Sequence, residues 1–285
     1  MLRQRVITAL IMVGIMFASL ASANPWPFAL VTLALLAAGA WEWGRLNQAP
    51  PALAYGLAGV LALAGLYAVA GGHAGVVSSA GLGGAWWLAA GVWVLGGAWI
   101  LRRGVQAWPH TPRVLRWLLG PALLLLAWAA LIEARAIGIN FMLSTLCVVW
   151  MADIAAYFGG KAWGRRKLAP GISPGKSWEG VWSGMAGVLM LAILWMVLDR
   201  QLGFDGPSLY TRLVQMHGWL VTALALLALC ALSVVGDLIE SLVKRAAGAK
   251  DSSQLLPGHG GVLDRVDALL PVLPAALALL SLGPR

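Results

Sequence analysis

Long apolar stretches follow one another along almost the whole chain, separated by short polar segments. About 20 consecutive apolar residues are needed to cross a bilayer as a helix. Measured against that length, the sequence predicts nine membrane-spanning helices, at roughly 6–23, 27–45, 53–71, 84–101, 116–134, 138–159, 180–198, 218–236 and 266–282. The stretches lack the alternation of apolar and polar residues that marks membrane β-strands. We therefore expect an all-α, polytopic helical bundle within a membrane.

Two regions are expected in this bundle. Residues 1–140 hold the first five spans, and residues 141–285 hold the last four together with two long polar loops. The first span has a second interpretation, because Arg3 and Arg5 precede it and Ala21-Ser22-Ala23 ends it, as in a cleavable signal peptide. We expect the span to be retained, since a start signal in a polytopic protein need not be cleaved.

The composition supports the membrane assignment. Hydrophobic residues make up 60% of the chain and charged residues 11%, whereas soluble domains have about 45–50% and about 25%. So few charges cannot cover a soluble body of 285 residues. The composition excludes an ordinary soluble enzyme and a disordered chain. Cys147 and Cys230, the two cysteines, both lie in apolar runs and show no disulfide or metal-binding spacing.

The basic residues predict the orientation. If the amino terminus is cytoplasmic, sixteen of the twenty Lys and Arg residues fall on the cytoplasmic side, and Arg135, Arg200, Arg212 and Arg285 fall outside. This asymmetry follows the positive-inside rule and puts both polar loops in the cytoplasm. The bases flank the spans and are not interleaved with aromatic residues, so we expect lipid or nucleotide phosphates, not nucleic acid, as partners.

The second polar loop holds the densest cluster of chemically useful side chains. Asp237 and Ser241 share one helix face, and Asp264 and Asp267 share another. Carboxylates beside bases, hydroxyls and a glycine-rich turn suit a metal-bound polyphosphate, because the acids hold the cation and the bases neutralise the phosphates. Taken singly, each charge is better explained as a solvated helix end, and His259 as a hydrogen-bonded loop histidine.

The stretch from Ser241 to Asp267 resembles the signature of the phosphatidate cytidylyltransferases, the CDP-diacylglycerol synthases. Twelve fixed positions of that signature are met, namely Ser241, Lys244, Arg245, Lys250, Asp251, Pro257, His259, Gly260, Gly261, Asp264, Arg265 and Asp267. The first loop is similar to two further family segments, around Asp153–Tyr157 and Ser173–Gly180, with Gly175 where Lys is common and Ser177 where Thr is common. The resemblance covers roughly 150–271; earlier residues match only in hydropathy and in Trp41-Glu42-Trp43.

The resemblance implies transfer of CMP from CTP to phosphatidic acid, giving CDP-diacylglycerol and pyrophosphate, in a bacterial inner membrane. We expect Asp237, Asp264, Lys250 and Arg265 to be catalytic, with Asp237 and Asp264 holding Mg²⁺, alone or with a second cation. Substrate binding is expected from residues of both loops and the sixth span: Asp153, Tyr157, Ser173, Lys176, Ser177, Ser241, Lys244, Arg245, Asp251, His259 and Asp267. Asp153 and Tyr157 are equally consistent with helix–helix hydrogen bonding.

Two other functions stay open from the sequence. A CTP-dependent enzyme acting on another lipid phosphate would have the same pattern. A secondary transporter would fit the hydropathy, although its charges should gather near the bilayer midplane and not at one face. Gly180 and Gly184 form a Gly-x-x-x-Gly pattern, which suits close packing either within the chain or in a homodimer.

Overall fold

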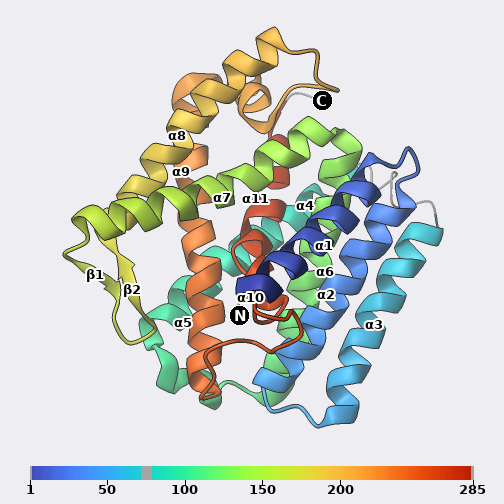
Figure 1. The fold of residues 1–285 in the computed structure, drawn as a ribbon, viewed down its shortest axis with the longest axis vertical. Helices are drawn as coiled ribbons and strands as arrows, with labels where there is room; N and C mark the ends of the chain where they lie inside the picture. The colour runs from blue at the N-terminus through green and yellow to red at the C-terminus, as the bar shows by residue number, and fades with distance from the viewer. Residues whose placement is uncertain (1, 72–78, 284–285) are drawn as a thin grey trace.

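The computed structural model describes residues 2–71 and 79–283 and is almost entirely helical (Figure 1). Seven helical segments are long and apolar enough to cross a membrane. They are α2 (Trp26–Leu46), α3 (Pro51–Ala70), Gly83–Arg103, α6 (Arg113–Ile137), α7 (Ile139–Trp163), α8 (Trp178–Gln201) and α9 (Leu209–Ala246). The third of these is a continuous run of α4 (Ser79–Gly91), the π-helical turn η1 (Val92–Gly96) and α5 (Gly97–Arg103). A helical membrane bundle is therefore confirmed.

The predicted number of nine spans is not confirmed. The first expected span is α1 (Leu2–Ala21), whose apolar part, Val6–Ala21, is shorter than the seven others. The ninth is divided into a short α10 (Leu263–Val266) and α11 (Leu269–Leu280). Twelve residues of helix rise only about 18 Å, less than the hydrocarbon thickness of about 30 Å.

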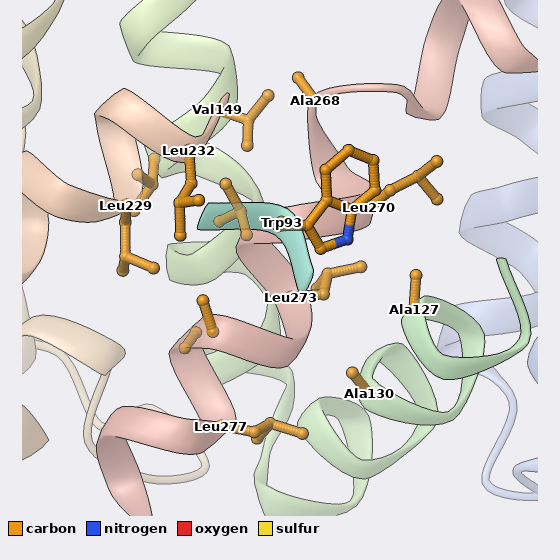
Figure 2. Packing of buried hydrophobic residues seen from close by; sticks show 14 of the residues in the cluster. Trp93, Ala127, Ala130, Val149, Leu229, Leu232, Ala268, Leu270, Leu273 and Leu277 are labelled. Atoms are coloured by element: carbon orange, nitrogen blue, oxygen red, sulfur yellow. The ribbon is translucent and has the colours of Figure 1, made fainter. Parts of the chain in front are cut away.

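Helix α11 forms the centre of the bundle. Its residues from Leu270 to Ala278 are almost fully buried, and Figure 2 shows Leu273 and Leu277 directed toward α6, with Leu229 and Leu232 of α9 nearby. A short helix can be apolar on all sides when other helices surround it. The hydropathy that predicted a ninth span therefore also describes a buried core helix.

The connections that follow α2, α5 and α9 lie at one end of the bundle. In Figure 1 the α2–α3 turn and the loop after α9 lie together at the lower end. The connection between α5 and α6 includes the short 3-10 helix η2 (Val105–His110), whose Trp108 donates to Asn47 in the α2–α3 turn. Arg135 marks the opposite end, where it donates to the carbonyls of Leu20 and Ser22. Arg285, a base expected on that side, lies outside the described residues.

The Gly-x-x-x-Gly pattern packs within the chain. A Cβ at Gly180 would lie 3.0 Å from the carbonyl oxygen of Ala156, and one at Gly184 would lie 2.9 Å from that of Ala152. Both carbonyls belong to α7, so the glycines let α8 approach the α7 backbone closely. The homodimer interpretation of this pattern therefore loses its support, and the homodimer itself stays a prediction.

The first polar loop contains a feature that the all-α prediction lacks. Strands β1 (Lys167–Ala169) and β2 (Ser173–Ser177) pair antiparallel as a small hairpin between α7 and α8. Ser177 then ends β2 and caps α8 by accepting a hydrogen bond from the Gly180 amide at 3.2 Å. Serine is a preferred N-cap, because its hydroxyl accepts from an amide that has no partner in the helix.

Candidate active site

The two polar loops meet through an ion pair. Lys176 lies on β2, and its Nζ is 2.6 Å from Oδ2 of Asp237 on α9. The other oxygen of Asp237 accepts from the Ser241 hydroxyl, one helical turn further along α9, at 3.2 Å. Arg245 supports the contact, because its Nε donates to the Ile172 carbonyl in the hairpin at 3.4 Å. Four predicted site residues thus join one hairpin to one helix.

A cavity of about 500 Å³ opens beside this ion pair. It lies between α7, α8, α9 and β2, and its lining includes Asp153, Tyr157, Lys176, Ser177 and Asp237. The remaining lining is mostly glycine, alanine and valine, with Cys230 at one wall. The structure therefore brings five predicted site residues from three elements, α7, β2 and α9, to one chamber that has charged groups on an apolar wall.

Lys244 lies on α9 about two helical turns beyond Asp237. Its side chain is placed between two carboxylates. Its Nζ is 2.5 Å from Glu240 and 2.6 Å from Asp264, and the three side chains are only 6–11% exposed. We predicted that Lys244 would bind phosphate, but here its ammonium joins α9 to the second loop. Buried charges of this kind are stable only when they are paired.

Asp264 organises the loop that surrounds it. Besides Lys244, it accepts from the Ser252 amide at 3.0 Å, the Ser252 hydroxyl at 2.9 Å and the Gly261 amide at 2.8 Å. Burial acts to raise the pKa of Asp264, but the hydrogen bonds from Lys244, Gly261 and Ser252 outweigh it and lower the pKa to about 2. Asp264 is therefore ionised at neutral pH.

The glycines of the His-Gly-Gly turn are required by these carboxylates. Gly260 has a positive φ of 83°, and a Cβ there would lie 2.9 Å from Oδ2 of Asp264. A Cβ at Gly261 would overlap the Ser252 hydroxyl and the Glu42 carboxylate. The sequence associated this glycine-rich turn with a bound polyphosphate. In the structure the Gly261 amide binds Asp264, an anion of the protein itself.

Glu42 was missed as a site residue. It lies on α2 and is 0% exposed. Its Oε1 accepts from the Ser253 hydroxyl at 2.5 Å and the Val262 amide at 2.9 Å, and its Oε2 accepts from the Ser252 hydroxyl at 3.1 Å and the Leu263 amide at 2.8 Å. Glu42 therefore ties the middle of the second loop to its junction with α10. The signal was present in the sequence as an acid inside an apolar helix.

The other predicted residues lie around the second loop, except for Ser173 in the hairpin of the first loop. Arg265 donates its Nε and a terminal nitrogen to the His259 carbonyl, so it braces the turn. Lys250 and Asp251 line a separate, more polar cavity of about 590 Å³, together with Arg45 at the end of α2. Ser173 opens β2 at the register position of Ala169. No described side chain is hydrogen-bonded to Ser173 or Lys250.

Asp267 comes close to Asp237 where α10 meets α11. Burial, and then the negative charge of Asp237, raise the pKa of Asp267. The approach depends on Gly236, since a Cβ there would lie 2.5 Å from the Asp267 carbonyl oxygen. Asp237 and the signature residue Asp267 are therefore brought together by direct contact between α9 and the start of α11.

The donor groups fit a hard cation at Asp237. Within residues 2–71 and 79–283, no three His, Cys, Asp or Glu side chains converge as a preformed metal site. Mg²⁺ does not need one, because it usually binds one or two carboxylates, water and substrate phosphate. The Asp237 carboxylate is 31% exposed at the cavity. Asp264, whose oxygens already receive four hydrogen bonds, is less free, and Lys244 would have to leave it first.

Comparisons with known proteins agree with the sequence signature. A model of the cytidylyltransferase family matches residues 3–282. The phosphatidate cytidylyltransferase of Pseudomonas aeruginosa is 39% identical over 285 residues, covering 98% of this chain and 97% of the relative. That of Haemophilus influenzae is 35% identical over 293 residues, covering 96% of each. That of Brucella melitensis is 48% identical over 146 residues, covering 51% of this chain and 47% of the relative. The chain therefore belongs to the cytidylyltransferase family.

Proposed function

We propose that the protein transfers CMP from CTP to phosphatidate. An oxygen of the lipid phosphate forms a bond to the α-phosphorus of CTP, the bond between the α-phosphorus and the bridging oxygen breaks, and pyrophosphate leaves. The lipid phosphate needs no general base, because a phosphate monoester with a second pKa of about 6 is already largely a dianion at pH 7. The difficulty is to bring two polyanions together, so catalysis depends on positioning and on neutralising charge.

The observation that carries the proposal is the chamber of about 500 Å³ with Lys176 and Asp237 on an apolar wall. A molecule that fits such a chamber combines a phosphate with an apolar body. Lys176 provides a cation for the lipid phosphate or the nucleotide, and the carboxylates around it favour a nucleotide that arrives with a bound cation. Bound Mg²⁺ would supply charge neutralisation at the triphosphate.

Both predicted metal ligands carry a lysine ammonium at 2.6 Å, Lys176 on Asp237 and Lys244 on Asp264. We infer that each ammonium compensates its carboxylate before substrate arrives. When the nucleotide binds with its cation, Lys176 moves from Asp237 to a phosphate oxygen. The same movement of Lys244 is limited by its burial and by Glu240. Asp237 is thus our first choice as the cation ligand, and Asp264 acts mainly as the anchor of the loop.

The direct test is a reaction of purified protein with labelled CTP, Mg²⁺ and phosphatidate in detergent micelles. We expect equal amounts of CDP-diacylglycerol and pyrophosphate, and no product with ATP or without lipid. Turnover with an isoprenoid phosphate in place of phosphatidate would identify the alternative substrate class. Absence of pyrophosphate release with both lipids would refute the proposal. Gel filtration checks that the unmodified protein used in this assay is folded, since it should elute as one symmetrical peak.

The expected orientation has both polar loops in the cytoplasm and the membrane as the bacterial inner membrane. Support comes from the bases at the site end of the bundle and from the positive-inside rule. The variants Gly175→Cys and Gly203→Cys test this orientation, each made in a protein in which Cys147 and Cys230 have been replaced. An added Cβ at either position has no atoms within 4 Å. In intact cells an impermeant thiol reagent should label position 203 and not position 175. The reverse pattern would overturn the orientation.

A further inference from the structure

A third cavity, of about 230 Å³, is not used by the function described above. It is enclosed by α6, α9 and the helix that contains η1 and α5. Four tryptophans line it, Trp43, Trp93, Trp99 and Trp108, and nearly all of the other lining residues are aliphatic or glycine. A cavity with such walls takes an apolar ligand.

The walls of the cavity face two different surroundings. Its inner wall includes Ile239 and Leu263, which are adjacent in the chain to Glu240 and Asp264. Its outer wall includes Trp99 and Leu115, which are 48% and 52% exposed on membrane helices. An apolar ligand could therefore extend from the lipid phase to within one residue of the carboxylates that hold Lys244.

One wall residue has a polar group that needs a partner. Trp93 is 5% exposed, and within the described part of the chain its Nε1 has no hydrogen-bond acceptor. Figure 2 shows its ring beside Leu270, among aliphatic side chains. A buried N–H without an acceptor is unfavourable and calls for an explanation. An oxygen atom on a ligand in the cavity would satisfy it.

The opening of the cavity is basic. The Arg103 guanidinium stacks over the Trp99 ring at 4.3 Å from the ring centre, so a positive charge lies beside the outer wall. Such a charge favours an anionic lipid over a neutral one at the opening. The ligand that fits these observations has an apolar chain, an oxygen acceptor near that chain and a negative headgroup.

We propose that this cavity binds one acyl chain of the phosphatidate substrate, with the ester carbonyl accepting a hydrogen bond from the Trp93 indole. The proposal rests on the proposed function, and it assigns the cavity to the lipid substrate. The chain occupies the space between α5 and α6, and its ester end lies at Trp93.

Filling the cavity tests the chain-binding role. A Cβ at Gly96, which lines the cavity, would meet only Val92 at 4.0 Å, so Gly96→Leu starts from an unobstructed position and reduces the space in the cavity. Gly91→Leu is the matched control, because position 91 is on the same helix, has no atoms within 4 Å of an added Cβ and does not line the cavity. We expect Gly96→Leu to raise KM for dipalmitoyl phosphatidate about tenfold, with a far smaller effect on dihexanoyl phosphatidate.

Trp93→Phe tests the hydrogen bond separately. The variant keeps an aromatic ring but removes the N–H, so KM should rise about tenfold for ester-linked phosphatidate and stay unchanged for the ether-linked analogue, which has no carbonyl. Equal effects on both lipids would overturn the hydrogen bond. An unaltered chain-length profile in Gly96→Leu, with the wild-type protein active, would overturn the cavity assignment alone. Inactivity of the wild-type protein toward every phosphatidate would instead refute the proposed function.

Discussion

Glu42 offers the sharpest test of how the site is held together, because one side chain on α2 binds both the middle of the second loop and its junction with α10. Each of its oxygens accepts one serine hydroxyl and one backbone amide. Glu42→Gln keeps the shape of the side chain but replaces one oxygen with an NH₂ group. Whichever way the amide turns, this NH₂ faces either the Val262 amide or the Leu263 amide, and one donor loses its acceptor.

The size of the effect follows from burial. Glu42 is 0% exposed, so water cannot replace the lost acceptor. An unsatisfied buried donor costs about 1–3 kcal/mol, which corresponds to a fall of roughly 5- to 150-fold in the docked population of the loop. Glu42→Ala would leave both amides and both hydroxyls without this acceptor, and it risks loss of the fold. Glu42→Gln is therefore the informative variant.

Hydrogen exchange and kinetics provide the assay. In Glu42→Gln the amides of residues 250–263 should exchange with solvent roughly 5- to 150-fold faster than in the wild type. The kcat should fall, while the KM for CTP changes less. Glu133→Gln is the matched control, since Glu133 is also an acid on a membrane helix but has no hydrogen bond to any described residue. If the exchange and kcat of Glu42→Gln equal those of the wild type, our account of the loop is refuted.

Three further predictions concern the same end of the bundle. Gly236→Ala should lower thermal stability by about 1–3 kcal/mol, because its Cβ meets the Asp267 carbonyl at 2.5 Å; equal melting temperatures for Gly236→Ala and Gly91→Ala would contradict this. Asp237→Asn should raise the Mg²⁺ concentration needed for half-maximal turnover, and an unchanged Mg²⁺ titration would remove Asp237 as the cation ligand. Lys176→Met should raise the KM for CTP, and the effects of Lys176→Met and Asp237→Asn should not add in the double variant, since the two groups form one ion pair; additive losses would show that they act independently.

The sequence by itself determined the class of the protein and the location of its chemistry. The lengths of the apolar runs predicted a helical membrane bundle, because a bilayer requires every spanning segment to satisfy its own backbone. The signature between Ser241 and Asp267 identified the family, which the comparisons confirm. The family confirmation leaves the individual roles of Lys250, Arg265 and His259 as predictions.

Only the tertiary structure decided which groups pair and which apolar helices are surrounded by others. Periodicity relates residues three or four apart, as in Asp237 and Ser241, but it carries no information about contacts across 210 residues such as Glu42 with Ser252. Hydropathy likewise cannot separate a membrane span from α11, since a lipid environment and a protein interior are equally apolar. The pairing of Lys176 with Asp237 depended on a hairpin that brings two distant loops together. Such contacts are set by the packing of helices, which no local pattern in the chain encodes.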